Sequence, residues 1–178
     1  MQTRHFQKNS EEWLEARKGK ITGSKLGDIV VKRGTGKKLG FYELIADRLA
    51  IEDDSEDPQE RGHRCEPVAL QLFQQEMGIE YIDTEQFWIS DDNEDIAISP
   101  DGVIDVETAV EVKCLSAAKH LQAYFEHKVP SEYEFQVLQY FIVNERLETL
   151  YFVFYDPRVT AKPLHWIEIH RDELEGEI

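Results

Sequence analysis

The feature that most constrains the fold is an alternating, strand-like run at residues 109–115, which follows a chain break at Pro100-Asp101-Gly102. Polar and apolar side chains alternate with a period of two along this run, as they do in a half-buried strand. Because successive strand side chains point to opposite faces, Glu111 and Lys113 share one face and the apolar residues of the run share the other. The apolar face indicates burial against helices, and the other face carries a carboxylate and an ammonium.

Asp101 stands ten positions before Glu111, which places the two carboxylates on facing arms of an expected β-hairpin. Two carboxylates can bind one or two Mg²⁺ ions through oxygen, and a neighbouring Lys can polarise the attacking water or help to deprotonate it. A metal-dependent phosphodiester nuclease needs this combination. The alternative is an ordinary hairpin with a solvated Glu-x-Lys pair, which explains most isolated matches. The preceding Asp and the flanking apolar residues favour the nuclease.

Ser99-Pro100-Asp101-Gly102 and Glu111-Val112-Lys113 resemble the core signature of the PD-(D/E)xK nuclease superfamily. Four further segments are similar to the phage-type recombination exonucleases, the lambda-exonuclease and YqaJ-like branch, namely 13–24, 62–69, 136–140 and 155–158. The resemblance covers about residues 10 to 160 in unchanged order. It implies an α/β fold of the restriction-endonuclease type, with a central twisted mixed β-sheet flanked by helices.

The length of 178 residues suits one nuclease domain. We divide it into a basic helical portion at about 1–50, a catalytic core at about 58–170 and an acidic tail at 171–178. The net charge of −16 opposes binding to nucleic acid, but the charge is unevenly distributed. Residues 1–48 carry eleven Lys or Arg against six Asp or Glu, and the rest carries nine against thirty. This N-terminal basic portion could follow a DNA backbone, although ordinary solvated helix charges are the alternative.

No apolar run approaches the roughly 20 residues of a membrane span, and the polar start lacks a signal-peptide segment. We therefore expect a cytoplasmic protein without a membrane contact. Cys65 and Cys114 lack the spacing of a zinc site, and we expect them to be isolated from each other, reduced and buried. The histidines lack a metal-site pattern and are expected at the surface or next to DNA; they are His63, His120 and His127.

Capping residues and hydrophobic periodicity predict six helices and seven strands. The helices are expected at 10–18, 22–31, 38–50, 58–77, 116–127 and 131–144. Pro67 requires the fourth helix to start near Glu66 or to kink. In the third helix Leu49 completes an apolar stripe with Phe41, Leu44 and Ile45. The strands are expected at 79–82, 86–90, 95–99, 102–105, 109–115, 149–155 and 164–170, in a sheet centred on the hairpin of the motif.

We expect Asp101 and Glu111 to be direct metal ligands, with the backbone carbonyl of Val112 as a further oxygen ligand. Lys113 faces the nucleophile, either as a base or as a cation that stabilises the transition state. The number of ions stays open, because a pair would clamp the attacking and leaving oxygens and a single ion would activate water alone. Glu66 lies on the apolar stripe of its helix, where a carboxylate is paired, protonated or bound to metal, or else favoured by the helix dipole. Resemblance to the family's helix-borne acid favours the metal site.

The resemblance assigns further roles. Gln136 heads a Gln-x-x-x-Tyr element that ends at Tyr140 and that orients the lysine or contacts DNA in related exonucleases. Leu138 stands where many phage-type members have a second Gln, so that Gln139 is either a DNA contact or part of a polar helix face. The 5′-phosphate of the degraded strand is assigned to Arg17, Ser24 and Ser99, although Ser24 also suits a helix N-cap and Ser99 a turn. Lys20 and Lys25 are assigned to the DNA backbone.

The implied activity is a Mg²⁺-dependent 5′→3′ exonuclease, with Mn²⁺ able to replace Mg²⁺, that digests one strand of double-stranded DNA from its ends. It leaves 3′ single strands for homologous recombination. The resemblance also implies a homotrimeric ring around DNA, a single-strand-annealing partner protein, and a phage or prophage protein in a bacterial host. The alternatives are an endonuclease on the same core and a non-catalytic DNA-binding or assembly subunit. An iron–sulfur exonuclease is disfavoured, because two Cys cannot supply four thiolates.

Overall fold

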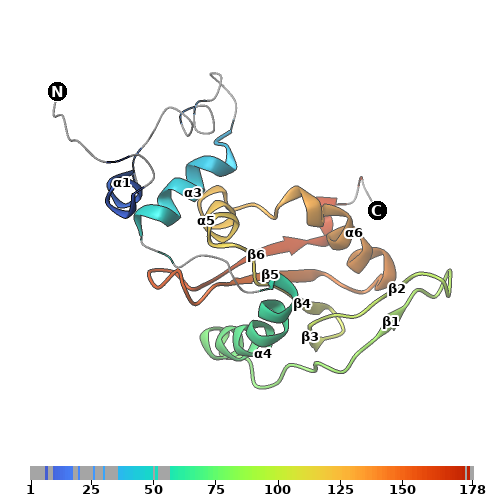
Figure 1. The fold of residues 1–178 in the computed structure, drawn as a ribbon. Coiled ribbons are helices and arrows are strands. Elements are labelled where there is room, and N and C mark those ends of the chain that lie inside the picture. The colour runs from blue at the N-terminus through green and yellow to red at the C-terminus, as the bar shows by residue number, and fades with distance from the viewer. Residues whose placement is uncertain are drawn as a thin grey trace.

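A four-stranded mixed sheet in the order β3-β4-β5-β6 forms the centre of the protein (Figure 1). The computed structural model describes residues 7, 10–17, 20, 26, 30, 36–49, 51, 57–174 and 176. The strands are β3 (Gly102–Asp105), β4 (Thr108–Lys113), β5 (Thr149–Tyr155) and β6 (Leu164–His170). The β4–β5 pair is parallel and the two outer pairs are antiparallel. The expected mixed sheet is confirmed.

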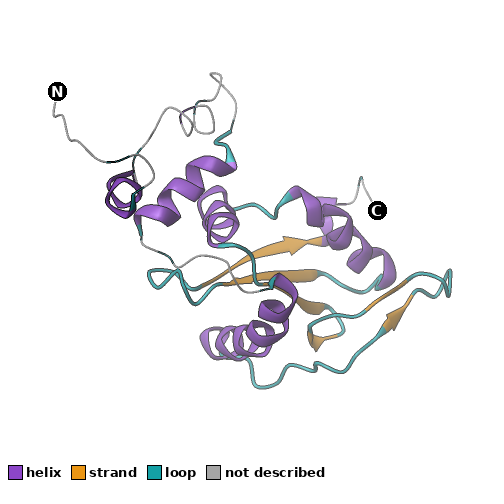
Figure 2. Ribbon diagram, in the orientation of Figure 1, coloured by secondary structure: helices purple, strands orange, loops and turns teal. Residues whose placement is uncertain are grey.

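Helices cover both faces of this sheet (Figure 2). Helix α4 (Pro58–Met77) lies on one face, and α5 (Ala117–Glu126) and α6 (Glu134–Val143) lie on the other. The remaining helical elements are α1 (Glu11–Arg17), α3 (Leu39–Arg48), and the short 3₁₀ helices η1 (Ser131–Tyr133) and η2 (Arg171–Leu174). Because α5 and α6 lie between β4 and β5 in the chain, they form the crossover that parallel strands require.

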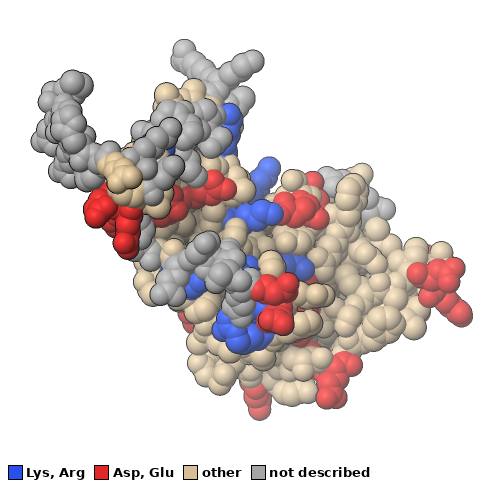
Figure 3. All heavy atoms as spheres, viewed as in Figure 1, with Lys and Arg blue, Asp and Glu red and all other residues tan. Residues whose placement is uncertain are grey.

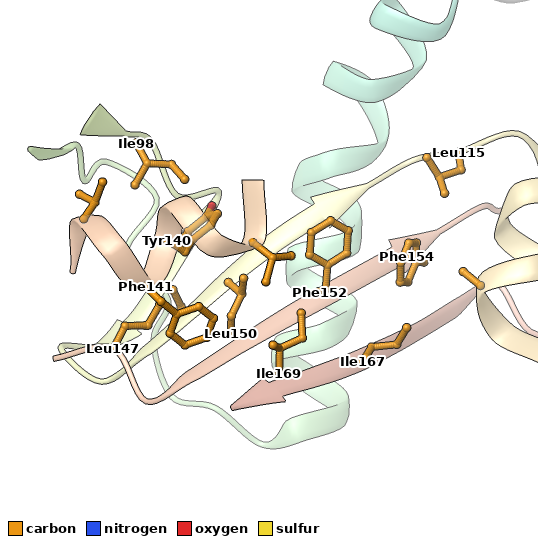
Figure 4. Close-up of a cluster of buried hydrophobic side chains, with 14 residues drawn as sticks. Ile98, Leu115, Tyr140, Phe141, Leu147, Leu150, Phe152, Phe154, Ile167 and Ile169 are labelled. Atoms are coloured by element: carbon orange, nitrogen blue, oxygen red, sulfur yellow. The ribbon is translucent and has the colours of Figure 1, made fainter. Parts of the chain in front are cut away.

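The two-residue alternation of the strands separates two cores. Val110, Val112 and Val153 pack with Ala69, Leu70 and Phe73 of α4. The intervening side chains point to the opposite face, where Ala109, Phe152 and Phe154 pack with Tyr140 and Phe141 of α6 (Figure 4). Glu111 and Lys113 alternate with Val110 and Val112, so they belong to the α6 face. The expected separation of the charged and apolar faces of this run is confirmed.

Local signals define the ends of α4. The Asp57 carboxylate accepts hydrogen bonds from the backbone N–H groups of Gln59 and Glu60, and Pro58 stands at the first helical position. Gly78 ends the helix with a φ of 66°, in the left-handed region that glycine adopts without strain. The predicted bounds are confirmed. The helix continues through Pro67, so the start near Glu66 that was considered for it does not occur.

Three predictions about the elements are wrong. Leu49 does not belong to the buried side of α3, since 54% of its surface is exposed, whereas only 1% of the surface of Tyr42 is exposed. The reason is that α3 packs on α5 through Tyr42, whose hydroxyl donates to Glu126 at 2.9 Å. Residues 79–82 form no strand, and the nearest pairing is a single bridge between Asp83 and Val103. The sheet is centred on β4 and β5, since β4 pairs with β5 and leaves β3 at the edge.

A separate two-stranded ribbon, β1 (Trp88–Ile89) and β2 (Ala97–Ile98), lies beside α6 at one end of the molecule (Figure 1). Both strands are shorter than predicted. The helix predicted at 22–31 falls almost wholly outside the described residues; within it, the Val30 N–H donates to the Leu26 carbonyl at 3.0 Å. Among the residues that the structure describes, no helix combines the length and the apolar composition that a membrane crossing requires.

Candidate active site

The site begins where the β3–β4 hairpin stops pairing. The last paired residues at this end are Gly102 and Val110, and Asp101 directly precedes them. The Asp101 carboxylate continues the pairing with its side chain, since its Oδ2 accepts a hydrogen bond from the Val112 N–H at 2.7 Å. This bond fixes the Asp101 side chain against the strand that carries Glu111 and Lys113. The predicted approach of the two halves of the motif is therefore present.

Gly102 permits this close approach. A Cβ atom at Gly102 would lie 2.5 Å from Cγ2 of Ile82 and 3.3 Å from Cδ2 of Leu70 in α4. The first distance is too short for two carbon atoms, so a larger residue would push the hairpin away from Ile82, which follows α4 in the chain. The Ser-Pro-Asp-Gly turn thus positions Asp101 through the packing of its glycine.

Glu111 is the most enclosed acidic residue of the site, with 3% of its surface exposed. Three donors satisfy its carboxylate. Lys113 Nζ and Gln136 Nε2 each donate to Oε1 at 2.6 Å, and the Tyr140 hydroxyl donates to Oε2. Gln136 and Tyr140 are four residues apart in α6, so they project from one side of that helix onto β4. A buried carboxylate needs such donors to offset its desolvation.

The Lys113 ammonium lies between the Glu111 carboxylate and two aromatic rings. It lies 4.9 Å from the ring centroid of Tyr133 and 6.0 Å from that of Phe152, close enough for cation–π attraction to both rings. The side chain keeps 20% of its surface exposed. The ammonium therefore remains accessible to a substrate, although it is also paired with Glu111.

Burial and neighbouring carboxylates act together on Asp101. Burial, followed by the negative charge of Glu111 and with a smaller contribution from Glu66, raises the pKa of Asp101 to about 7, against the opposing effects of the Val112 N–H and the Lys113 ammonium. Burial and the charge of Glu111 also raise the pKa of the Tyr140 hydroxyl, so Tyr140 remains a donor. The site thus attracts additional positive charge.

Glu66 reaches the site from α4, on the other side of the sheet from α6. It is half-buried, and its charge acts on both Asp101 and Cys114. Within the described part of the chain, no group of three or more His, Cys, Asp or Glu side chains converges closely enough to hold a metal ion alone. Asp101 and Glu111 are consequently the two carboxylates at the centre, with Glu66 at the periphery.

The residues assigned to DNA are spread over the molecule. Tyr140 is fully buried against Glu111, so it supports that carboxylate and offers no surface to DNA, contrary to the assignment. Gln139 Nε2 donates to the backbone carbonyl of Ala97 at 2.8 Å and ties α6 to β2. It therefore has a structural contact on the ribbon side of the helix.

Of the three residues assigned to the 5′-phosphate, the structure describes Arg17 and Ser99. Arg17 is exposed on α1, where its guanidinium lies 4.3 Å from the centroid of the Trp13 ring. Ser99 is exposed next to β2, which Figure 1 shows at the opposite end of the molecule from α1. Ser24 and Lys25 lie outside the described residues, and Lys20 is exposed after α1. The structure therefore does not bring Arg17 and Ser99 together.

Sequence reasoning missed two supporting residues. Tyr133 lies under the Lys113 ammonium, and its position three residues before Gln136 could have indicated a shared helix side. Arg61, 6% exposed in α4, donates from Nη2 to the Cys114 carbonyl at 3.2 Å and holds the end of β4. No local pattern distinguishes Arg61 from a surface cation.

Two expectations about neighbouring side chains were also wrong. Cys65 and Cys114 lie in contact, and burial together with the Cys65 thiol raises the pKa of Cys114 to about 12; both thiols are free. His120 is fully buried instead of exposed, with its Nε2 2.9 Å from the Lys162 carbonyl oxygen. Its ring packs on His165, with centroids 4.5 Å apart.

Comparisons with known proteins agree with this arrangement. No curated protein matches the chain. The structure is similar to that of an alkaline exonuclease (LHK-Exo) from Laribacter hongkongensis, with a TM-score of 0.62 and 27% sequence identity over 94% of this chain and 86% of that chain. The complex of LHK-Exo with dAMP matches with a TM-score of 0.61, at the same identity and coverage.

A family model describes most of the chain. The YqaJ-like viral recombinase domain matches residues 12–147, which include all of the residues that meet at Glu111. This match and the similarity to an alkaline exonuclease confirm the resemblance to phage-type recombination exonucleases of the PD-(D/E)xK type. The chain therefore belongs to the family of YqaJ-like viral recombinase domains.

Proposed function

We propose that the protein is a Mg²⁺-dependent 5′→3′ exonuclease that digests one strand of double-stranded DNA from its ends. The remaining 3′ single strand would then enter homologous recombination. The observation that carries the proposal is the convergence of Asp101, Glu111 and Lys113 at the end of the β3–β4 hairpin. Membership of the recombinase family and the similarity to an alkaline exonuclease support the same class of substrate and reaction.

The donor set fits a hard divalent cation. Asp101 and Glu111 offer carboxylate oxygens, and burial, followed by the negative charge of Glu111, raises the pKa of Asp101, so that a cation beside it would be favoured. Mg²⁺ commonly binds one or two carboxylates and completes its shell with waters and substrate phosphates, so a third protein carboxylate is not required. Asp101 and Glu111 would hold the ion, with the Val112 carbonyl and Glu66 as further oxygen donors. When bound, the ion would lower the pKa of a coordinated water and neutralise charge on the phosphate.

The protein's own groups would orient these parts. Gln136 and Tyr140 hold Glu111 in one rotamer, and the Val112 N–H does the same for Asp101. Lys113 supplies an ammonium that can move from Glu111 to the phosphodiester, where charge builds up during hydrolysis. The aromatic rings of Tyr133 and Phe152 lie beside the ammonium and limit its path.

The charge distribution supports a DNA substrate despite the overall acidity. In Figure 3, Lys and Arg gather in a band down the middle of the visible face with some Asp and Glu beside them, and a further acidic group occupies the β1–β2 turn at the edge. We further propose that the active form is a homotrimeric ring with an acidic exterior and that it works with a single-strand-annealing protein in the cytoplasm of a phage-infected host. The family match supports the DNA substrate and the role in recombination on which these proposals rest.

The test is digestion of linear duplex DNA with and without Mg²⁺, using Lys113→Ala and Asp101→Ala. Lys119→Ala is the matched control, because Lys119 forms an ion pair of the same length, 2.6 Å to Glu132, with both side chains more than 40% exposed. We expect the two site variants to lose about 10²–10⁴-fold in rate and the control to keep its activity. Mg²⁺-dependent digestion at the wild-type rate in both site variants would refute the proposal.

Direction and end dependence need separate substrates. Phosphorothioate linkages at the 5′ ends should block digestion, whereas the same linkages at the 3′ ends should leave it unchanged. Cleavage of covalently closed circles would instead indicate an endonuclease. Binding without any Mg²⁺-dependent digestion would indicate a DNA-binding subunit.

A further inference from the structure

Five large apolar side chains are exposed where the β1–β2 ribbon meets the β3–β4 turn and the end of α6. We call this area the ribbon surface, and it comprises Tyr81, Phe87, Ile89, Val106 and Ile142, which are 67%, 64%, 52%, 43% and 42% exposed. These residues come from four different parts of the chain. The fold therefore gathers apolar groups here without burying them.

The ribbon surface is hollowed. One hollow of about 450 Å³ is lined by Phe87, Ile89, Val106 and Ile142. A second, of about 400 Å³, is reached by Tyr81, and both hollows share Trp88, Val106 and Asn144. The two hollows therefore adjoin, and exposed apolar groups line each of them. Contiguous apolar areas of this kind on soluble proteins usually mark interaction sites.

The hollows are held open by contacts beneath them. Trp88 packs edge-on against Tyr140 with centroids 6.1 Å apart, and its ring N–H donates to the Gln86 side chain at 2.7 Å. Asn144 Nδ2 donates to the Val106 carbonyl at 3.0 Å, which ties the β3–β4 turn to the end of α6. A ligand that enters the hollows would therefore find a preformed surface and would not need to order it.

The rim of the ribbon surface is acidic. Asp83, Asp91, Asp105 and Glu145 line the two hollows, and Arg146 is the one cation among the residues that line them. The β1–β2 turn adds Asp92, Glu94 and Asp95, and Figure 3 shows this acidic group at the edge of the molecule. A nucleic acid would be repelled by this charge. A segment that carries both apolar and basic side chains would be attracted.

We propose that the ribbon surface binds a basic amphipathic segment of a partner protein. Its apolar side chains would fill the hollow between Phe87 and Ile142, and its Lys or Arg side chains would pair with the acidic rim. This surface is separate from the groups that meet at Glu111, so the proposal does not depend on the proposed nuclease activity.

The experiment uses peptides as probes of the intact chain. Random peptides displayed on phage are selected against the immobilised protein, and an enriched sequence is synthesised with a fluorophore and measured by fluorescence anisotropy. We expect the enriched sequences to combine apolar residues with Lys or Arg, and their affinity to fall as salt rises. Enriched sequences that are acidic or lack apolar residues would overturn the proposal.

Substitutions then locate the binding site. Phe87→Ser and Ile142→Ser should each lower the affinity for the peptide by about 10-fold or more, which corresponds to about 1.4 kcal/mol. Glu145→Lys should also lower this affinity. Phe135→Ser is the matched control, because Phe135 is 83% exposed in α6 and does not line either hollow. Thermal melting verifies that each variant is folded. Equal peptide affinity in Phe87→Ser, Ile142→Ser and the wild type would overturn the proposal.

Two other occupants are distinguished by parallel measurements. If Phe87→Ser dissociates a wild-type oligomer during sedimentation, the ribbon surface is an interface between copies of this chain and the proposal is overturned. If Phe87→Ser weakens the binding of a single-stranded oligonucleotide and leaves peptide binding unchanged, the surface binds nucleic acid and the proposal is again overturned. Unchanged sedimentation and oligonucleotide binding, together with weaker peptide binding, support it.

Discussion

Replacing Asp101 by Asn should stabilise the protein at neutral and alkaline pH when divalent cations are removed. Asn keeps an acceptor for the Val112 N–H, which Asp101 binds at 2.7 Å, and removes only the charge. Burial, followed by the negative charge of Glu111, raises the pKa of Asp101 from 3.8 to about 7. The folded protein therefore binds a proton at Asp101 more tightly than the unfolded chain does.

The sign and size of the effect follow from this difference. A carboxyl whose pKa is raised by folding contributes stability below the unfolded value of 3.8 and loses that contribution as the pH rises through about 7. The interval between the two pKa values corresponds to about 4 kcal/mol between the two protonation states. Above pH 7 we expect Asp101→Asn to exceed the wild type in free energy of unfolding by up to about 4 kcal/mol.

Urea unfolding at a series of pH values, with EDTA present throughout, measures this gap. The gap between Asp101→Asn and the wild type should be largest above pH 7 and should shrink as the pH falls from about 7 toward 3.8. Asp105→Asn, at an exposed position at the other end of β3, is the control. A gap that does not vary with pH, or a wild type more stable than Asp101→Asn at alkaline pH, would refute the electrostatic argument.

Three further substitutions test other parts of the structure. Tyr140→Phe removes one of the three donors to Glu111 and should lower the free energy of unfolding, measured with urea, by about 1.5–3 kcal/mol. The loss should be smaller when the same substitution is made in a Glu111→Gln protein. Gly102→Ala should cost about 1–3 kcal/mol because of the 2.5 Å contact of its Cβ, whereas Gly62→Ala, which has open space in α4, should gain about 0.5–1 kcal/mol in the same assay. Burial lowers the pKa of His165 to about 3, so the contribution of its neutral form to stability is complete above pH 6.5 and is lost as the pH falls toward 3. His165→Phe should therefore show a smaller fall in melting temperature than the wild type as the pH is lowered. Equal slopes for the variant and the wild type would contradict this.

The elements with strong local signals were predicted from the sequence. The bounds of β5 and β6 match the predicted ranges, and α4 begins and ends at the predicted residues. These signals lie within a few residues of the structure that they describe, such as the Asp57 cap and the φ of 66° at Gly78. The short strands β1 and β2 carry weaker signals and were predicted too long.

The pairing of Asp101 with β4 was also predictable, because a short turn connects the halves of one hairpin and alternation sets the face of each side chain. Gln136 was predicted from the resemblance, but its 2.6 Å bond to Glu111 depends on where α6 lies on the sheet. The burial of Tyr140 has the same origin. Periodicity places a residue on one side of a helix and does not say which neighbour that side meets.

The sequence alone thus determined β5, β6 and α4, the polar and apolar faces of β4, and the hairpin that joins Asp101 to Glu111. Only the tertiary structure decided that β4 pairs with β5, that Cys65 meets Cys114, and that His120 is buried. It also left Arg17 and Ser99 apart and gathered the apolar groups of the ribbon surface. The reason is that backbone preferences and periodicity act over a few residues, whereas contacts between distant segments depend on how whole elements pack against one another.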